Sequence, residues 1–336
     1  MNPYKEIENE ILNASHILIT AHKSPDGDSV GSSLGLLHFI ESLGKKAVIG
    51  HPDPAPEFLQ WLEGADSIMY MERDEEVLKN HFQKADLIFC LDYNGSDRVG
   101  PEMQQLIKST SAKKIMIDHH LNPEDFVDIM ISDPEVCSTA QLIYELIEQS
   151  GHADLLNEKI GTPLYLGILT DTGSFRFPSV QPRTHEILGK LLGAGVQHHL
   201  VHEQLNDNNT VARLKLQGYA MSEKLEILDS CHAAIISLTE TELTRFTAQK
   251  GDTDGLANLA LSIKGVRIAV CLYEKEGKIK MSFRSKGQEN PVNILAEEHF
   301  DGGGHANASG GISELGMEAT LKKLKTLLPV YFKSDK

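Results

Sequence analysis

Short apolar runs alternate with longer amphipathic segments along the first half of the chain. The short runs are rich in β-branched residues and predict buried strands, whereas the longer segments have the apolar spacing of helices. The predicted strands cover residues 16–21, 46–50, 85–91, 113–117 and 127–132, and the predicted helices cover residues 3–14, 29–43, 138–150 and 156–169. Strands that alternate with helices indicate βαβ units, so we expect an α/β domain with a mostly parallel sheet flanked by helices.

The pattern changes after about residue 211. Residues 183–205 have helical spacing, and the runs over 233–238, 266–273 and 278–285 predict strands of a smaller α/β domain with a mixed sheet. We therefore predict a first domain over 1–182, a helical linker over 183–210 that acts as a hinge, and a second domain over 211–336.

Acidic and imidazole side chains follow several of the predicted elements. They are His22, Asp26 and Asp28 after the first strand, Asp92 after the third, Asp118, His119 and His120 after the fourth, and Asp171 after the last of the predicted helices. Ligands of open α/β sheets bind beyond the carboxyl ends of the strands, so we expect these side chains to converge on one edge. Such a cluster would repel itself unless cations lay within it. Mixed carboxylate and imidazole ligands suit Mn²⁺, Fe²⁺ or Zn²⁺, and fewer nitrogens suit Mg²⁺.

Each of these residues, taken alone, also has a structural explanation. Asp26 and Asp28 fit a turn, Asp92 fits an Asx-turn, Asp171 fits a cap, and His22 fits a hydrogen-bonded core histidine. Their recurrence at successive element ends favours a site for two metals instead. Two divalent cations about 3.5–4 Å apart are the usual apparatus for in-line displacement at phosphorus. We therefore predict hydrolysis of a phosphoester by water that the metals activate.

The second half of the chain adds basic and glycine-rich features. Alternate residues of the strand near 278–286 are Lys278, Lys280, Ser282, Arg284 and Lys286. The lysines fit a solvated face, whereas the guanidinium of Arg284 matches a phosphate. Gly302, Gly303 and Gly304 precede His305, and they fit either a flexible turn or a loop whose backbone approaches an anion.

Composition argues against proteins that bind long nucleic acid, membrane proteins and secreted proteins. The net charge of −16 argues against a protein that holds long nucleic acid through its overall field. No apolar run approaches the roughly 20 residues that span a bilayer, and the N-terminal stretch lacks the pattern of a signal peptide. The four cysteines are scattered and without a Cys-x-x-Cys motif, so we expect buried, reduced thiols in a cytoplasmic protein that does not bind membranes.

The combination of His22-x-x-x-Asp26-x-Asp28, Asp92, Asp118-His119-His120, Asp171 and a Gly-Gly-Gly-His segment ending at His305 resembles the DHH–DHHA1 phosphoesterases. The resemblance covers about residues 15–330 and is strongest to the stand-alone nanoRNase and pAp phosphatase (NrnA-like) group. It implies an N-terminal DHH domain and a C-terminal DHHA1 domain. It also implies two divalent cations, Mn²⁺ first, with Mg²⁺ or Co²⁺ as alternatives.

The resemblance also implies a role for each site residue. One metal would be held by His22, Asp26 and Asp92, and the second by Asp28, Asp92, His119 and Asp171, with Asp92 as the bridge. Asp118 and His120 would be catalytic: the first would orient or protonate nearby groups, and the second would contact the scissile phosphate. Arg284, Gly303, Gly304 and His305 would bind the rest of the substrate across a cleft between the domains.

The implied activity is hydrolysis of short oligoribonucleotides from the 3′ end and of 3′-phosphoadenosine 5′-phosphate (pAp). A cytosolic phosphodiesterase of linear or cyclic dinucleotides is an alternative, because the same metals serve both reactions. A nucleotide-binding sensor without turnover is the alternative from another class. It predicts a missing metal ligand, and every expected ligand is present in the sequence. The oligomeric state is open, with a homodimer among the options.

Overall fold

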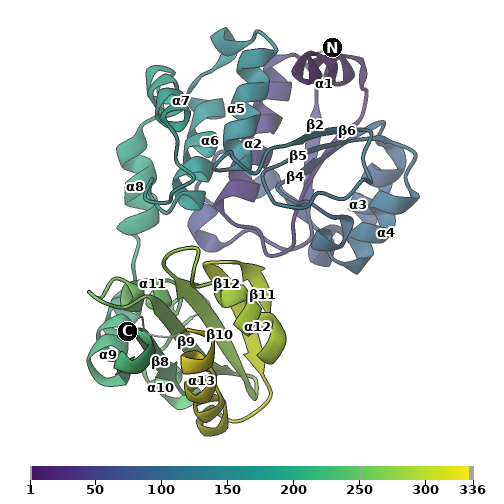
Figure 1. Ribbon diagram of the computed structural model, residues 1–336. Helices are drawn as coiled ribbons and strands as arrows, with labels where there is room; N and C mark the ends of the chain where they lie inside the picture. The colour runs from purple at the N-terminus through teal and green to yellow at the C-terminus, as the bar shows by residue number, and fades with distance from the viewer. Residues whose placement is uncertain (1, 250, 333–336) are drawn as a thin grey trace. The chain divides into compact units, whose positions relative to one another are not determined.

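A computed structural model describes residues 2–249 and 251–332 of the chain (Figure 1). The chain forms two compact units that divide between Asn208 and Asn209. The first unit contains the segments that precede the predicted ligands, and the second contains the basic strand and the glycine-rich segment.

The first unit contains a six-stranded sheet in the order β3-β2-β1-β4-β5-β6, and every neighbouring pair is parallel. The strands are β1 Ile17–Ala21, β2 Ala47–His51, β3 Met69–Tyr70, β4 Leu87–Leu91, β5 Lys113–Asp118 and β6 Ile129–Ser132. All residues of β1 and β4 are buried, as expected for central parallel strands with helices on both faces. The predicted parallel α/β architecture is therefore confirmed.

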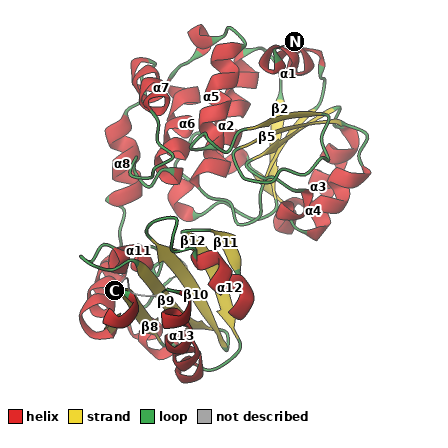
Figure 2. Ribbon diagram, viewed as in Figure 1, coloured by secondary structure: helices red, strands yellow, loops and turns green. Residues whose placement is uncertain are grey.

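Two hydrophobic cores cover the two faces of this sheet. Helices α2, α5 and α6 pack on the face that carries Ile19, and α3 and α4 pack on the face that carries Leu18 (Figure 2). Successive strand residues point to opposite faces, which explains why neighbouring apolar residues belong to different cores. The helices of the unit are α1 Pro3–Asn13, α2 Gly27–Ser42, α3 Met71–Lys84, α4 Pro101–Ser109, α5 Thr139–Gln149, α6 Glu158–Asp171, α7 Pro182–Gly193 and α8 His198–Asn206.

The segment predicted as a linker, residues 183–210, is mostly part of the first unit. Ile187 and Leu191 of α7 and Val201 of α8 are buried in the core that also contains Ile19. The apolar stripes of these helices pack against the first unit. Helix α7 contacts both α5 and α6, whereas α8 contacts α6. The division between the units lies at the end of the segment instead.

The second unit contains a six-stranded mixed sheet in the order β11-β12-β10-β9-β8-β7. Only β8 and β9 are parallel among its described pairs. Its elements are α9 Val211–Tyr219, β7 Leu225–Leu228, β8 Ala233–Leu238, α10 Glu240–Arg245, α11 Leu256–Leu261, β9 Ile268–Lys275, β10 Lys278–Ser285, α12 Val292–His299, β11 Gly303–His305, β12 Ala308–Ser313 and α13 Met317–Tyr331. The predicted mixed sheet is confirmed.

Each face of the second sheet has its own core. Helices α12 and α13 cover the face of Phe283, whereas α9 and α11 cover the face of Ala269 and Cys271. Ser282 and Arg284 belong to this second face, because they pair with Cys271 and Ala269 across the antiparallel β9–β10 pair.

Two further expectations concern the whole chain. All four cysteines are free and buried, as expected from their apolar surroundings. Among the described residues, no helix has the length and apolarity that crossing a lipid bilayer requires.

Candidate metal centre

Three neighbouring strands bring the predicted ligands to one edge of the first sheet. His22 follows β1, Asp92 follows β4, and His119 follows β5. These strands are adjacent and parallel, so their carboxyl ends lie side by side. The expected convergence is therefore present.

Asp26 and Asp28 are held at the start of α2. The carboxylate of Asp26 caps the helix, since its Oδ1 accepts hydrogen bonds from the backbone nitrogens of Asp28 (3.1 Å) and Ser29 (3.0 Å). Asp28 is buried, and its carboxylate accepts hydrogen bonds from the backbone of Thr139 (2.6 Å) and Ala140 (2.9 Å) in the first turn of α5. Capping thus explains part of the sequence pattern and also fixes where the carboxylates lie.

Asp92 lies at the middle of the cluster in an unusual backbone conformation. Its φ angle is +62°, in the left-handed region that residues other than glycine seldom adopt. Its backbone nitrogen donates to Ile117 O at 3.1 Å, and its Oδ1 accepts from the hydroxyl of Thr139 at 2.9 Å. Such strain persists where surrounding structure imposes it, and it concentrates at functional sites.

The ligand atoms are spaced as they would be around cations. His22 Nε2 lies 3.4 Å from Asp92 Oδ2, and His119 Nε2 lies 3.6 Å from Asp92 Oδ1 and 3.4 Å from Asp171 Oδ2. Metal–ligand bonds of about 2.0–2.2 Å put neighbouring ligand atoms about 3 Å apart or slightly more. The separations are therefore too long for good hydrogen bonds and suit ligands around an ion.

Three groups of side chains offer ligand atoms within 4.8 Å of one another. They are His22, Asp26 and Asp92; Asp28, His119 and Asp171; and Asp92, His119 and His120. We call the six residues of the first two groups the metal centre. Two of the groups share Asp92, which gives this carboxylate the position of a bridge.

The imidazole of His22 is oriented for ligation. Its Nδ1 lies 2.9 Å from the carbonyl oxygen of Lys23, which can only accept, so Nδ1 carries the hydrogen. In the neutral ring Nε2 is then the unprotonated atom, and it is the one that faces Asp26 and Asp92. A hydrogen bond of this kind commonly fixes the tautomer of a metal-binding histidine.

Crowded carboxylates dominate the electrostatics of the metal centre. Burial raises the pKa of Asp28 well above its usual range, and the charges of Asp92 and Asp171 raise it further. Burial also raises the pKa of Asp171 to about 7, although His119 opposes the shift. Raised pKa values of this kind show that the carboxyl groups lack positive charge around them, and divalent cations would supply it. The donor set therefore fits divalent metal ions.

Asp118 and His120 form a separate pair beside the ligands. Asp118 is fully buried, and its Oδ1 lies 2.7 Å from His120 Nδ1. Burial lowers the pKa of His120, but the hydrogen bond to Asp118 and the charge of Asp92 outweigh burial and raise it. Asp118 thus fixes the ring of His120 and favours its protonated form. His120 also lies 3.8 Å from Asp92, so it borders the metal centre directly.

Two residues that interact with the metal centre were not predicted from the sequence. Thr139 lies at the start of the helix predicted over 138–150, and it contacts both Asp28 and Asp92. His51 ends β2, is fully buried, and has its Nε2 3.0 Å from the hydroxyl of Ser33. Burial lowers the pKa of His51 to about 3, and the charge of His22 adds to the effect. The sequence feature that could have indicated His51 is its position at the end of an apolar strand, which resembles the position of His22 after β1.

The predicted substrate-binding residues lie in the second unit. Arg284 on β10 pairs with Ala308 on β12, and Ala308 pairs in turn with His305 on β11. Directly paired residues project to the same face of a sheet, so Arg284 and His305 share a face with only a methyl group between them. The same face continues through Gly310 and Gly303, which have no side chains.

The glycine-rich segment was expected to be a loop, but it forms strand β11. Glycine is required at Gly302 and Gly304 because an added Cβ would lie 2.0 Å from Gly310 O and 2.7 Å from Ala308 O, respectively. Gly304 also has a φ angle of +138°, which glycine tolerates best. At Gly303 the nearest atom belongs to the Glu297 side chain at 3.7 Å, so strand pairing does not explain this glycine.

Comparison with known proteins agrees with the two-unit division. The family models described as "DHH family, N-terminal domain" and "DHHA1 domain" match residues 16–168 and 233–329. The chain is 31% identical over 317 residues to a bifunctional oligoribonuclease and PAP phosphatase NrnA from Thermus thermophilus, covering 94% of this chain and 87% of that protein. It is 27% identical to the cyclic-di-AMP phosphodiesterase GdpP from Bacillus subtilis, covering 98% of this chain and 49% of GdpP. A crystal structure of an exopolyphosphatase-related protein from Bacteroides fragilis is 38% identical, with a TM-score of 0.95 and coverage of 98% and 96%.

Proposed function

Because the chain belongs to the DHH family of metal-dependent phosphoesterases and carries a DHHA1 domain, we propose that it hydrolyses short oligoribonucleotides from the 3′ end and removes the 3′-phosphate of pAp. The observation that supports this most directly is the position of Asp92 between two sets of ligand atoms. A carboxylate shared in this way suits two cations, which is the arrangement used for displacement at phosphorus.

In the proposed site, His22, Asp26 and Asp92 would hold one cation, and Asp28, Asp92, His119 and Asp171 would hold the other. Mn²⁺ suits this mixture of carboxylates and imidazoles, with Mg²⁺ and Co²⁺ as substitutes. When bound, such cations neutralise charge on the phosphoryl oxygens and lower the pKa of the attacking water. Thr139 and Ala140 hold the carboxylate of Asp28 in place, so the protein contributes a preformed geometry.

Asp118 and His120 together stabilise the negative charge that develops on the phosphoryl group. The Nδ1 atom of His120 is engaged by Asp118, and we assign donation to a phosphate oxygen to its Nε2 atom. A protonated imidazole stabilises the additional negative charge of the transition state, and Asp118 keeps that proton in place. The role resembles that of a buried carboxylate that orients a catalytic histidine.

The second unit supplies groups for the rest of the substrate. Arg284 would bind a non-scissile phosphate through its guanidinium, and His305 on the same sheet face would add a second donor. Gly303 leaves that face without a side chain, and the neighbouring Gly304 has none either, so a nucleotide can approach the backbone there. A few placed donors suit a substrate of a few nucleotides, consistent with the net charge of −16 that disfavours long nucleic acid. The four free cysteines favour a reducing compartment such as the cytoplasm.

A phosphodiesterase of linear or cyclic dinucleotides is the second candidate, because the chain also matches about half of GdpP. The two candidates share the metal centre and differ in substrate. Incubation with pAp, a short RNA, a linear dinucleotide and cyclic di-AMP in parallel, each with Mn²⁺, separates them. We expect release of phosphate from pAp and of mononucleotides from the RNA, and loss of both activities in Asp92→Asn. Turnover of cyclic di-AMP alone would favour the second candidate, and a fully active Asp92→Asn would refute both.

A further inference from the structure

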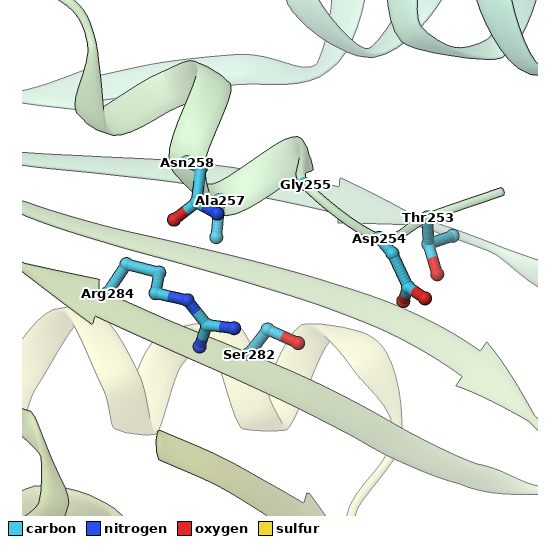
Figure 3. A pocket seen from close by; sticks show the side chains of 7 residues that line it. All are labelled: Thr253, Asp254, Gly255, Ala257, Asn258, Ser282 and Arg284. Atoms are coloured by element: carbon cyan, nitrogen blue, oxygen red, sulfur yellow. The ribbon is translucent and has the colours of Figure 1, made fainter. Parts of the chain in front are cut away.

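A small cavity lies in the second unit beside Arg284, between helix α11 and strand β10 (Figure 3). Its volume is about 80 Å³, and its walls come from Thr253, Asp254, Gly255, Ala257, Asn258, Ser282 and Arg284. Ser282 and Arg284 project from the same face of β10, since they are two residues apart. Figure 3 shows the guanidinium of Arg284 beside Ser282, and Asn258 projecting from the helix toward them.

Three polar side chains of this cavity, those of Ser282, Asn258 and Arg284, are little used by the described part of the chain. Arg284 Nη1 donates to the carbonyl oxygen of Phe283 at 2.8 Å, which engages one of the five N–H donors of the guanidinium. Within the described residues, the side chains of Ser282 and Asn258 have no partner elsewhere in the chain. A cavity with a few convergent polar groups that the fold does not consume is typical of a ligand site.

Size and charge restrict what the cavity can hold. A cavity of roughly 150 Å³ is known to accommodate a benzene ring, so about half that volume is too small for a nucleobase. Asp254 also borders the cavity and places a carboxylate near Arg284, which disfavours a second phosphate beside the one that Arg284 would bind. A hydroxyl group meets both limits. The Ser282 hydroxyl and the Asn258 amide can each donate to and accept from a hydroxyl, and the Asp254 carboxylate can accept from one.

We propose that this cavity receives the 2′-hydroxyl of the ribose whose phosphate binds Arg284, with Asn258 and Ser282 as its hydrogen-bond partners. The 2′-hydroxyl is the group by which a protein distinguishes RNA from DNA at a given position. The cavity therefore makes the protein selective for ribonucleotides. This inference rests on the proposed phosphoesterase function and adds a sugar preference to it.

Two substrates that differ only in the sugar test the proposal. The full-length protein with Mn²⁺ is assayed on a 5′-phosphorylated adenylyl dinucleotide and on its deoxyribose counterpart, and kcat/KM is measured for each. We expect a ribose preference of at least tenfold in the wild type. Asn258→Leu and Ser282→Ala should each reduce that preference about fivefold by slowing the ribose substrate, because each removes one hydrogen bond. Ser262→Ala is the matched control: its hydroxyl lies at the end of α11 and donates to Leu259 O, so the preference should not change.

The outcomes separate the inference from the proposed function. Equal kcat/KM values for the two substrates in the wild type, or variants that slow both substrates equally, would overturn the inference while leaving the proposed function intact. Calorimetric titration with AMP and 2′-deoxy-AMP needs no hydrolysis. If neither dinucleotide is cleaved but AMP binds at least fivefold more tightly than 2′-deoxy-AMP, the proposed function fails and the sugar preference stands. Equal binding of the two mononucleotides also overturns the inference.

Discussion

Replacing Gly31 by alanine should weaken both the fold and the metal centre. Gly31 lies at the contact between α2 and α6, where an added Cβ would be 2.4 Å from Pro163 O and 3.1 Å from Gly167 N. These are backbone atoms, so no side-chain rotation relieves the overlap. The same two helices carry Asp28 in the first turn of α2 and Asp171 at the end of α6. A change in their separation therefore acts directly on two proposed ligands.

The structure sets the size of the effect. Real Cβ contacts are essentially never closer than 3.0 Å, so the helices must separate locally by at least 0.6 Å, from 2.4 to 3.0 Å. Overpacking of this kind costs about 1–3 kcal/mol. For a domain of this size, each kcal/mol lowers the melting temperature by roughly 2–4 °C, so we expect a decrease of about 2–12 °C. Displaced ligands should also weaken Mn²⁺ binding about tenfold, as changes around metal ligands commonly do.

Thermal unfolding followed by circular dichroism measures the first effect, and calorimetric titration with Mn²⁺ measures the second. Gly189→Ala is the matched control, because Gly189 lies in α7 and an added Cβ would have no neighbour within 4 Å. Alanine is the better helix former, so this variant should gain about 0.5–1 kcal/mol. If Gly31→Ala melts at the wild-type temperature and binds Mn²⁺ as tightly, the α2–α6 contact does not set the ligand spacing and the reasoning is wrong.

Three other predictions follow from particular contacts. Asp118→Asn keeps the shape of the side chain but removes the charge that holds His120. We therefore expect kcat to fall about 10–100-fold while Mn²⁺ affinity is retained. An unchanged kcat would contradict the role assigned to Asp118. Removal of metal by EDTA should lower the melting temperature, and Mn²⁺ at 100 times its Kd should raise the free energy of unfolding by about 2.7 kcal/mol. A melting temperature that responds to neither treatment would argue against a metal site. The third concerns pH: despite burial, the hydrogen bond from Lys224 lowers the pKa of Glu242 to about 2 from an ordinary value of 4.5. This depressed folded-state pKa stabilises the protein above pH 4.5 and is lost as pH falls toward 2, so Glu242→Gln should lower the melting temperature near pH 7 by an amount that vanishes toward acid.

Most strands of the first sheet were predictable because central parallel strands are short, mainly apolar runs. Strand β3 was not, since two residues carry no periodic pattern. Strands β11 and β12 were missed for a different reason: Gly302 to Gly304 and the pair Gly310-Gly311 carry the composition of a turn. Their pairing depends on close backbone approach between segments, which a hydrophobic pattern does not record.

The direction in which α7 and α8 pack was also outside the reach of the sequence. Both helices have an apolar stripe, and a stripe shows that a helix has a partner without showing which one. In the structure, Ile187 and Val201 are buried in the core that contains Ile19, so the partner of both helices is the first unit. The helical spacing of residues 183–205 corresponds to α7 and α8, while the assignment of 183–210 to a separate hinge came from position along the chain.

The residues of the metal centre could be named from the sequence because parallel strands end at a common edge, so position in the chain implies position in space. What holds them there could not be named. The hydrogen bonds from the Thr139 backbone to Asp28 and from its hydroxyl to Asp92 join residues 111 and 47 positions apart. The left-handed backbone of Asp92 depends on the same surroundings. Sequence pattern thus identifies atoms that bind a ligand more readily than atoms that orient them.

The pKa directions at the metal centre explain why these supporting contacts matter. Asp28 and Asp171 have raised pKa values because the fold buries them near other carboxylates, an arrangement that opposes stability when no cation is bound. The fold offsets part of that cost with backbone donors from the start of α5, where the helix dipole also favours negative charge. Donors that are fixed before a cation arrives leave the carboxylates in place, so metal binding relieves repulsion without requiring rearrangement. The same principle predicts that loss of the Thr139 hydroxyl should weaken metal binding more than it weakens the fold.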